Sequence, residues 1–315
     1  MSSSEAARWL TSSSAGPLLA VSPHLDDLVF SACAPVLARP LEVWTVFAGA
    51  PEPPTVTDWD RGCGFRDSTD ALTRRRREDT AAFEGTRATV RHLPHLDGPY
   101  TDPVRRQADL AEFRTDLERW IDQHPGGTVL APACAGVRVP PGVWERFRRA
   151  RGLVAPAAPA PGVEAVEDPV GRTVTPPVRQ VTSAVKAGLR RLMHADYQRR
   201  RAAAQRRGLA VNNDHVAVRD AVLEAAWRRP ATSVVLYEDL PYLWSQSADA
   251  EVQELRRRGL EPVEFSLPVD VDEKFRRIQA YESQVDVMDP VHRRLSRAGS
   301  LPPAERYWLL SSTRA

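Results

Sequence analysis

Residues 17–28 read Pro-Leu-Leu-Ala-Val-Ser-Pro-His-Leu-Asp-Asp-Leu, an apolar run that leads directly into a histidine and two adjacent carboxylates. The run at 18–21 predicts a buried strand, so His24, Asp26 and Asp27 fall where that strand ends and the next helix begins. The carboxyl ends of strands are the usual place for chemistry in an open α/β sheet. We therefore expect these three polar side chains to converge on one point.

The residue types in this stretch match a divalent metal site that keeps a reactive water. An imidazole and one carboxylate bind the ion, and a second carboxylate that is free of the ion takes the proton of the water. The same stretch is also compatible with a simple helix start, in which Asp27 caps residues 28–32 and His24 is a polar turn residue. Taken alone, the stretch leaves both interpretations open.

A second polar cluster lies far downstream, where Asn-Asn-Asp-His at 212–215 opens a segment of helical character at 216–223. A catalytic zinc ion commonly takes three protein ligands and keeps one further position open. His215, at the junction of a loop and a helix, is the candidate for the third ligand. The two clusters together favour the metal interpretation.

These clusters resemble the motifs of the PIG-L family, also called LmbE-like zinc amide hydrolases. The first family motif, usually His-Pro-Asp-Asp-Glu, appears as His-Leu-Asp-Asp-Leu at 24–28, and the second, His-x-Asp-His, appears at 212–215. Other family-like segments follow in the family's order at 45–49, 74–79, 93–97, 237–242 and 274–284. The resemblance therefore extends over most of the chain.

The resemblance implies a zinc-dependent N-deacetylase that removes an acyl group from an amino sugar or a related small metabolite. By the family pattern, His24, Asp27 and His215 hold the Zn2+ ion, and Asp26 is the general base for the metal-bound water. In the family, the first histidine of the second motif stabilises the oxyanion and supplies a proton to the leaving amine. Asn212 occupies that position in this chain.

Asn212 is the departure from the family pattern with the largest consequence. An amide donates a hydrogen bond to an oxyanion, but it does not act as an acid at neutral pH. The proton for the amine then comes from Asp26 by a change of role, or from His95, which precedes Asp97 at a strand end expected to face the same cleft. Two alternatives stay open: a metal-binding relative without hydrolytic turnover, and a zinc-dependent acyl transfer or condensation enzyme.

The resemblance also implies residues that bind the substrate. Asp97 and Arg76, which belongs to the arginine run at 74–77, are candidates for contacts with substrate hydroxyls or anionic groups. The alternative for each arginine of the run is an exposed position in the first turn of a helix.

Composition limits the other classes of function. The chain has 315 residues, of which 42% are apolar and 27% charged, with a formal net charge of +2. Its arginine runs are typical of solvated helix faces and lack interleaved aromatics, so no nucleic-acid partner is expected.

Three widely spaced cysteines predict no disulfide framework. Without a signal-like leader or a long apolar run, we expect a cytoplasmic protein with no membrane segment, and a homo-oligomer is an open possibility.

The order of expected elements indicates an α/β fold with a Rossmann-like, mostly parallel sheet and helices on both faces, as in LmbE-like proteins. Strands are expected at 18–22, 41–47, 89–93, 128–131 and 233–237, and helices at 28–37, 73–84, 103–123, 216–227 and 272–283. Residues 1–16 are predicted to be a polar N-terminal lead, and residues 17–315 a single PIG-L-like α/β domain.

One long segment interrupts this order at 137–208, and we interpret it as an insertion. Residues 155–162 are rich in proline and alanine, a composition typical of a flexible or extended connector. Residues 181–207 carry apolar side chains at helical spacing, which predicts an amphipathic helix. This helix is a candidate for a lid, a specificity element or a dimer contact, and the alternative is a peripheral helix docked on the core.

Overall fold

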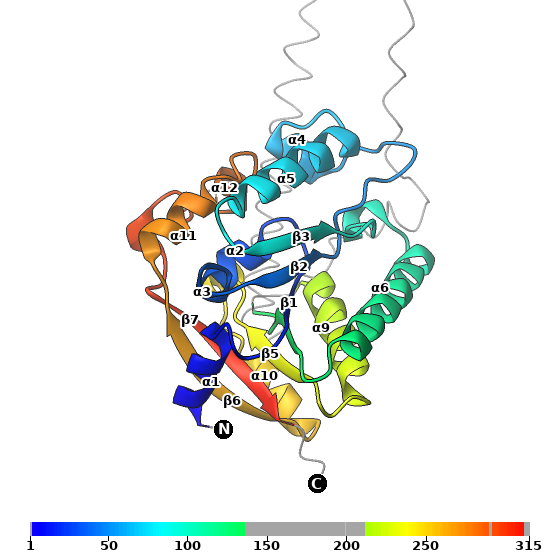
Figure 1. The fold of residues 1–315 in the computed structure, drawn as a ribbon. Helices are drawn as coiled ribbons and strands as arrows, with labels where there is room; N and C mark the ends of the chain where they lie inside the picture. The colour runs from blue at the N-terminus through cyan, green and yellow to red at the C-terminus, as the bar shows by residue number, and fades with distance from the viewer. Residues whose placement is uncertain (1, 136–198, 200–211, 290–291, 312–315) are drawn as a thin grey trace, which may run out of the picture. The chain divides into compact units, whose positions relative to one another are not determined.

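Seven strands form one sheet in the described part of the chain, in the order β3-β2-β1-β4-β5-β7-β6 (Figure 1). Their bounds are Leu18–Ser22 (β1), Leu41–Thr45 (β2), Ala88–His92 (β3), Thr128–Pro132 (β4), Ser233–Tyr237 (β5), Glu261–Pro268 (β6) and Ala304–Ser311 (β7). Strands β1 to β5 pair in parallel, whereas β7 is antiparallel to both β5 and β6. The predicted α/β class with a mostly parallel sheet is confirmed.

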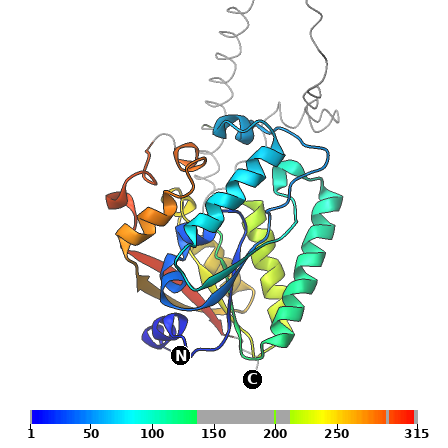
Figure 2. The same cartoon turned by 45° about the horizontal axis from the view of Figure 1, so that its top comes forward.

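Helices flank the sheet on both faces (Figure 2). Their bounds are Ser3–Thr11 (α1), Asp27–Ser31 (α2), Cys33–Ala38 (α3), Asp58–Cys63 (α4), Ser68–Ala82 (α5), Pro103–Gln123 (α6), Asn213–Trp227 (α9), Asp249–Arg257 (α10), Val271–Ile278 (α11) and Val285–Met288 (α12), with short 3-10 helices at Gly98–Tyr100 (η1), Tyr242–Trp244 (η2) and Ala298–Ser300 (η3). Leu18 and Ala20 of β1 join a core with α1, α2, α3 and α11, while Leu19 and Val21 join a core with α6, α9 and α10. Because side chains alternate along a strand, β1 contributes to both cores.

The structure is a computed structural model that describes residues 2–135, 199, 212–289 and 292–311. Apart from Arg199, these residues belong to one compact unit formed by Met1–Arg138 and Ala210–Ala315. The predicted insertion, with its connector and amphipathic helix, lies outside the described residues except for Arg199. None of the described helices is both long and apolar enough to cross a membrane.

The central strands form where the sequence has uninterrupted apolar runs. All five residues of β1 and of β4 are buried, as expected for parallel strands covered on both faces. The edge strand β6 alternates between buried and exposed residues and contains Pro262 and Pro268, which an edge strand tolerates. Strands β6 and β7 are absent from the expected elements, because outward-facing charges such as Glu264 and Arg306 interrupt their apolar pattern.

Residues 1–16, expected to be a polar lead, contain the helix α1. Ser2 and Glu5 form a capping box at its start. Its buried residues Ala6 and Leu10 lie four positions apart on one helical face and pack into the core beside β6. Two apolar side chains are a weak signal within a serine-rich stretch, so composition alone conceals this helix.

The single helix expected at 28–37 is divided into α2 and α3. Ala32 leaves the helical conformation, with φ −138° and ψ 45°. Glu305 of β7 accepts hydrogen bonds from the backbone N–H groups of Cys33 and Ala34, both at 2.9 Å, at the start of α3. A contact with a residue far along the chain therefore accompanies the break, which local periodicity does not predict.

The strand order changes direction at β1. The chain passes from β1 to β2 and β3 on one side, and later places β4 and β5 on the other side. The loops that follow β1 and β4 diverge there, at the position where open α/β sheets bind ligands. His24 and Asp27 follow β1 directly, so the fold places them at this point.

Candidate metal centre

The loop after β1 positions the first two side chains of the site. Ser22 Oγ donates a hydrogen bond to the carbonyl oxygen of His24 (2.7 Å) and accepts one from Leu28 N (3.2 Å). Asp27 Oδ2 accepts a further hydrogen bond from the backbone N–H of His24 (2.8 Å). The local backbone thus determines where the imidazole of His24 and the carboxylate of Asp27 lie.

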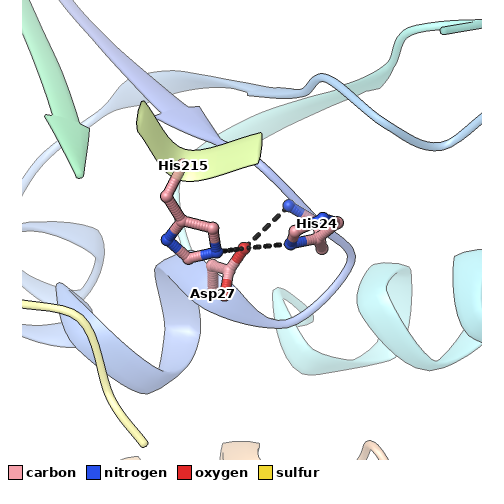
Figure 3. A group of neighbouring side chains, drawn as sticks. All are labelled: His24, Asp27 and His215. Atoms are coloured by element: carbon pink, nitrogen blue, oxygen red, sulfur yellow. Dashed lines mark hydrogen bonds and ion pairs between the residues drawn. The ribbon is translucent and has the colours of Figure 1, made fainter. Parts of the chain in front are cut away.

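His215 forms a group of three with His24 and Asp27 (Figure 3). Asp27 Oδ2 lies 3.0 Å from His24 Nδ1 and 3.2 Å from His215 Nε2. All three residues are buried, and one ligand atom from each lies within 4.8 Å of the others. Two ring nitrogens and one carboxylate oxygen are a donor set that suits a zinc site with one position left open.

Asp239 orients His215. Asp239 Oδ1 lies 2.5 Å from His215 Nδ1, and Oδ2 accepts hydrogen bonds from the N–H groups of Cys134 (2.7 Å) and Ala135 (3.0 Å). With Nδ1 engaged, Nε2 is the ring nitrogen that faces Asp27. This buried Nε2 has no hydrogen-bond partner among the described residues, because its approach to Asp27 lacks hydrogen-bond geometry. A buried nitrogen whose other ring position is held by a carboxylate is typical of a metal ligand.

The second nitrogen of His24 faces two further carboxylates. His24 Nε2 lies 3.2 Å from Asp214 Oδ2 and 3.5 Å from Asp97 Oδ1. Each carboxylate is also paired with an arginine: Asp214 with Arg106, and Asp97 with Arg75, whose Nη1 lies 3.9 Å from Asp97 Oδ2. The arginines already neutralise the charge of these two carboxylates. The carboxylates are therefore suited to accept a hydrogen bond from the Nε2–H of a neutral His24, which leaves Nδ1 for a metal ion.

Arg106 attaches α6 to the start of α9. It pairs with Asp214, donates from Nη1 to the carbonyl oxygen of Leu96 (2.8 Å), and lies over the ring of Phe47 at 3.9 Å from its centroid. The backbone N–H of Gly98 in η1 also donates to Asp214 Oδ2 (3.3 Å). Several elements therefore fix the carboxylate that contacts His24.

Asp26 lies beside the group of three and is not one of its members. Its side chain is buried, and Arg75 Nη2 lies 3.7 Å from Asp26 Oδ2. Burial, together with the neighbouring Asp27 carboxylate, raises the pKa of Asp26 to about 7, although Arg75 and His24 act in the opposite direction. A carboxyl group with a pKa near neutrality can both accept and release a proton at physiological pH.

The charges around the two histidines favour a cation between them. Burial opposes ionisation of Asp27, but His215 and His24 outweigh it and hold the pKa of Asp27 well below its usual value. Burial lowers the pKa of His215, but Asp27 and Asp239 together raise it to about 9. The carboxylates thus stabilise positive charge on the imidazoles, and a bound divalent cation supplies that charge when the histidines are neutral.

His95 lies in the loop after β3 and does not contact the group of three. Its Nδ1 is 3.7 Å from Asp109 Oδ1, and neither ring nitrogen has a hydrogen-bond partner among the described residues. The loop packs on Gly49, whose N–H donates to the carbonyl oxygen of His95 (2.8 Å) and where a Cβ would lie 2.1 Å from the carbonyl oxygen of Pro94. Burial lowers the pKa of His95, which favours the neutral ring.

Within the arginine run, Arg75 faces the site and Arg76 does not. Arg76 donates from Nε to the carbonyl oxygen of Ala48 (2.8 Å), so it supports the loop after β2. Arg75 is 5% exposed and lies on the buried face of α5 with Leu72 and Asp79, at helical spacing. The sequence signal that distinguishes Arg75 from Arg76 is therefore helical spacing, which places Arg75 and not Arg76 on the buried face of α5.

Asn212 caps α9 and contacts an aromatic side chain. Its Oδ1 accepts a hydrogen bond from Asp214 N (3.0 Å), and its Nδ2 donates to Tyr242 Oη (3.2 Å). The rings of Tyr242 and His215 form an edge-to-face contact, with ring centroids 5.1 Å apart and planes at 77°. The Asn212 amide, expected to face the oxyanion, is thus hydrogen-bonded to the first turn of α9 through its oxygen and to the Tyr242 hydroxyl through its nitrogen.

Four residues that complete the site were not assigned to it from the sequence: Arg75, Arg106, Asp239 and Tyr242. Asp239 follows β5 by two residues, so the strand-end argument that identifies His24 also applies to it. Arg106 stands near the start of a long polar helix and carries no motif signal. Only the packing of α6 against α9 brings Arg106 to Asp214.

Replacing Asp239 by asparagine is expected to weaken zinc binding by about 10- to 100-fold, the usual effect of losing a carboxylate that orients a ligating histidine. Asparagine keeps an oxygen for the N–H groups of Cys134 and Ala135 but loses the charge beside His215. Competition with a chromogenic chelator measures the affinity. Glu238→Gln is the matched control, since Glu238 contacts Ala248 N (2.9 Å) instead of the site; equal affinities for both variants would contradict this role of Asp239.

The chain shares its fold with deacetylases of known structure, while no protein-family model and no curated protein sequence matches it. A crystal structure of the A40926 pseudoaglycone deacetylase has 24% sequence identity and a TM-score of 0.58, over 96% of this chain and 99% of that one. The zinc-inhibited form of the teicoplanin deacetylase has 20% identity and a TM-score of 0.57, over 95% and 100% of the two chains. A deacetylase–teicoplanin complex from the teicoplanin pathway has 21% identity and a TM-score of 0.56, over 95% and 100%. This protein therefore has the α/β fold of these deacetylases, and its candidate metal centre lies at the carboxyl ends of the strands of that fold.

Proposed function

We propose that this protein is a metal-dependent amide hydrolase that removes an acyl group from the nitrogen of an amino sugar. The observation that carries the proposal is the convergence of ligand atoms from His24, Asp27 and His215, with the carboxylate of Asp26 beside them. The shared fold supports it, since the similar structures are deacetylases of teicoplanin and of the A40926 pseudoaglycone. An N-acyl amino sugar, free or attached to such a compound, is the proposed substrate.

Zn2+ is the proposed ion. Two neutral imidazoles and one carboxylate suit zinc, and the buried Nε2 of His215, which no described residue engages in a hydrogen bond, fits a ligand atom. When bound, zinc lowers the pKa of a coordinated water and polarises the substrate carbonyl. Asp239 and Asp214 contact the other ring nitrogens of His215 and His24, and they would hold the two imidazoles in place for the ion.

Asp26 is the proposed proton carrier. It accepts a proton from the attacking water and returns it to the amine nitrogen as the C–N bond breaks. Arg75, with Nη2 at 3.7 Å, holds the Asp26 carboxylate next to the group of three. Asp97, which is partly exposed and also contacts Arg75, is proposed to accept a hydrogen bond from a substrate hydroxyl. Because Arg76 is engaged by Ala48, it is proposed to act on the substrate only through the loop it supports.

An assay for release of a free amine tests the proposal. We expect the zinc-loaded protein to deacylate N-acetylglucosamine or an N-acetylglucosaminyl derivative of the teicoplanin type, to lose this activity with a chelator, and to regain it when zinc is restored. Stoichiometric zinc binding without amine release from any acylated amino sugar would favour the alternative of a metal-binding relative without turnover. Activity that survives complete removal of the metal would contradict the mechanism.

A further inference from the structure

Tyr242 stands at the border of the metal group. It opens η2, five residues after the end of β5, and its ring forms an edge-to-face contact with the ring of His215. The residue is partly exposed, whereas the three members of the group are buried. Tyr242 therefore lies next to the metal group without being fully buried itself.

The hydrogen bond with Asn212 leaves the proton of Tyr242 available. Asn212 Nδ2 is the donor and Tyr242 Oη the acceptor, at 3.2 Å. A phenol oxygen that accepts a hydrogen bond still has its own O–H to donate. No residue in the described part of the chain accepts that proton. An ordinary phenol is protonated at neutral pH, so this O–H is present as a donor.

We propose that Tyr242 is a catalytic residue, whose hydroxyl donates a hydrogen bond to the oxyanion that forms when water adds to the substrate carbonyl. This inference rests on the proposed amide hydrolysis. Asn212 is then a positioning residue, since it acts through the phenol. The chain thus supplies an oxyanion donor from η2, in the region where the family motif would supply one from the start of α9.

The loop that carries Tyr242 is held in place, as an oxyanion donor requires. Leu240 N donates to Ser31 Oγ (2.9 Å), and Leu243 N donates to the carbonyl oxygen of Asp239 (2.8 Å). Asp239 in turn contacts His215 through its side chain. The phenol and the imidazole of His215 are therefore attached to the same short segment, and a donor fixed in advance needs no reorganisation during the reaction.

The side chain of Asn212 is less available for the oxyanion than that of Tyr242. Its oxygen caps α9 through Asp214 N, and one of its N–H groups is directed to the phenol. These two hydrogen bonds fix the plane of the Asn212 amide. Among the described residues, the Tyr242 hydroxyl has one hydrogen-bond partner, Asn212 Nδ2, from which it accepts.

Tyr242→Phe and Asn212→Ser separate the two residues. Tyr242→Phe removes one oxyanion donor, so kcat should fall by about 10²- to 10³-fold with little change in KM. Asn212→Ser keeps a good helix cap and removes only the contact that positions the phenol. Its kcat should therefore fall by about tenfold or less, which is a smaller loss than deletion of the whole donor causes. The reverse order of effects, or wild-type kcat in Tyr242→Phe, would overturn the assignment.

Binding of a tetrahedral analogue gives a readout that is independent of turnover. The methylphosphonamidate of glucosamine should bind Tyr242→Phe more weakly than wild type by a factor similar to the loss in kcat, while glucosamine binds both equally. Zinc content and thermal unfolding show that the variant is loaded and folded. Tyr307→Phe, which removes a buried hydroxyl bonded to Glu305 Oε2 (2.6 Å), is the control and should keep wild-type kcat.

The two proposals fail in different ways. If the wild-type protein releases no amine, the proposed hydrolysis is wrong whatever Tyr242 does. If wild type is active and Tyr242→Phe matches it in kcat and in affinity for the analogue, only the role of Tyr242 is wrong.

Discussion

Asp26→Asn is expected to lower kcat for amide hydrolysis by about 10²- to 10⁴-fold, the range associated with losing a general acid–base group. Asparagine has nearly the same size, so it can fill the buried position beside Arg75, but it cannot take a proton from water. Because Asp26 is not one of the three ligand residues, the variant should still bind one zinc ion per chain. Steady-state kinetics and metal analysis on the same preparation measure both quantities.

The control for this variant is Asp289→Asn. Asp289 is also buried and also paired with an arginine, Arg294, whose Nε lies 2.9 Å from Asp289 Oδ2. It has no contact with the metal group, so its substitution should leave kcat within a few-fold of wild type. A loss in Asp26→Asn no greater than in this control, with zinc still bound, would show that Asp26 carries no proton in the reaction.

His215→Asn is expected to remove both zinc binding and the stability that zinc provides. In the wild type, free zinc at 100 times its Kd should add about 2.7 kcal/mol to the free energy of unfolding. For a domain of this size that corresponds to a rise in Tm of roughly 4 to 5 °C. The variant lacks the Nε2 that faces Asp27, so its Tm should not respond to zinc, and its hydrolytic activity should be lost.

Thermal unfolding with and without zinc, followed by circular dichroism, measures this difference. His124→Asn is the control, because His124 packs on Trp120 at a ring-centroid distance of 4.4 Å and lies outside the metal group. It should show the zinc response of the wild type. A His215→Asn protein that is stabilised by zinc as strongly as this control would place the ion elsewhere.

Local sequence signals are sufficient to predict the central strands of the sheet and the three residues that form the metal group. The apolar runs of β1 and β5 predict their strands with the bounds observed, because these strands are buried on both faces. His24, Asp27 and His215 could be predicted to meet, because two of them follow a strand end and the third belongs to a motif of fixed order. The structure places the three together, and their role as zinc ligands stays a proposal.

The rest depends on contacts between distant parts of the chain. Asp239 is paired with His215, and Arg106 with Asp214, through the packing of elements that are far apart in sequence. Neither pair has a local signal that identifies its partner. The same holds for Arg75, which can be distinguished from its neighbours only once the buried face of α5 is known. Charged side chains on the outer face of β6 and β7 conceal those strands for a similar reason.

The carboxylate of Asp239 also couples two parts of the fold that lie far apart in the sequence. One of its oxygens accepts hydrogen bonds from the N–H groups of Cys134 and Ala135, just after β4, and the other lies beside His215 in the first turn of α9. A single side chain therefore links the end of β4 to the start of α9. A substitution that displaces the turn at Cys134 and Ala135 would be transmitted to the imidazole of His215, although neither residue belongs to the metal group.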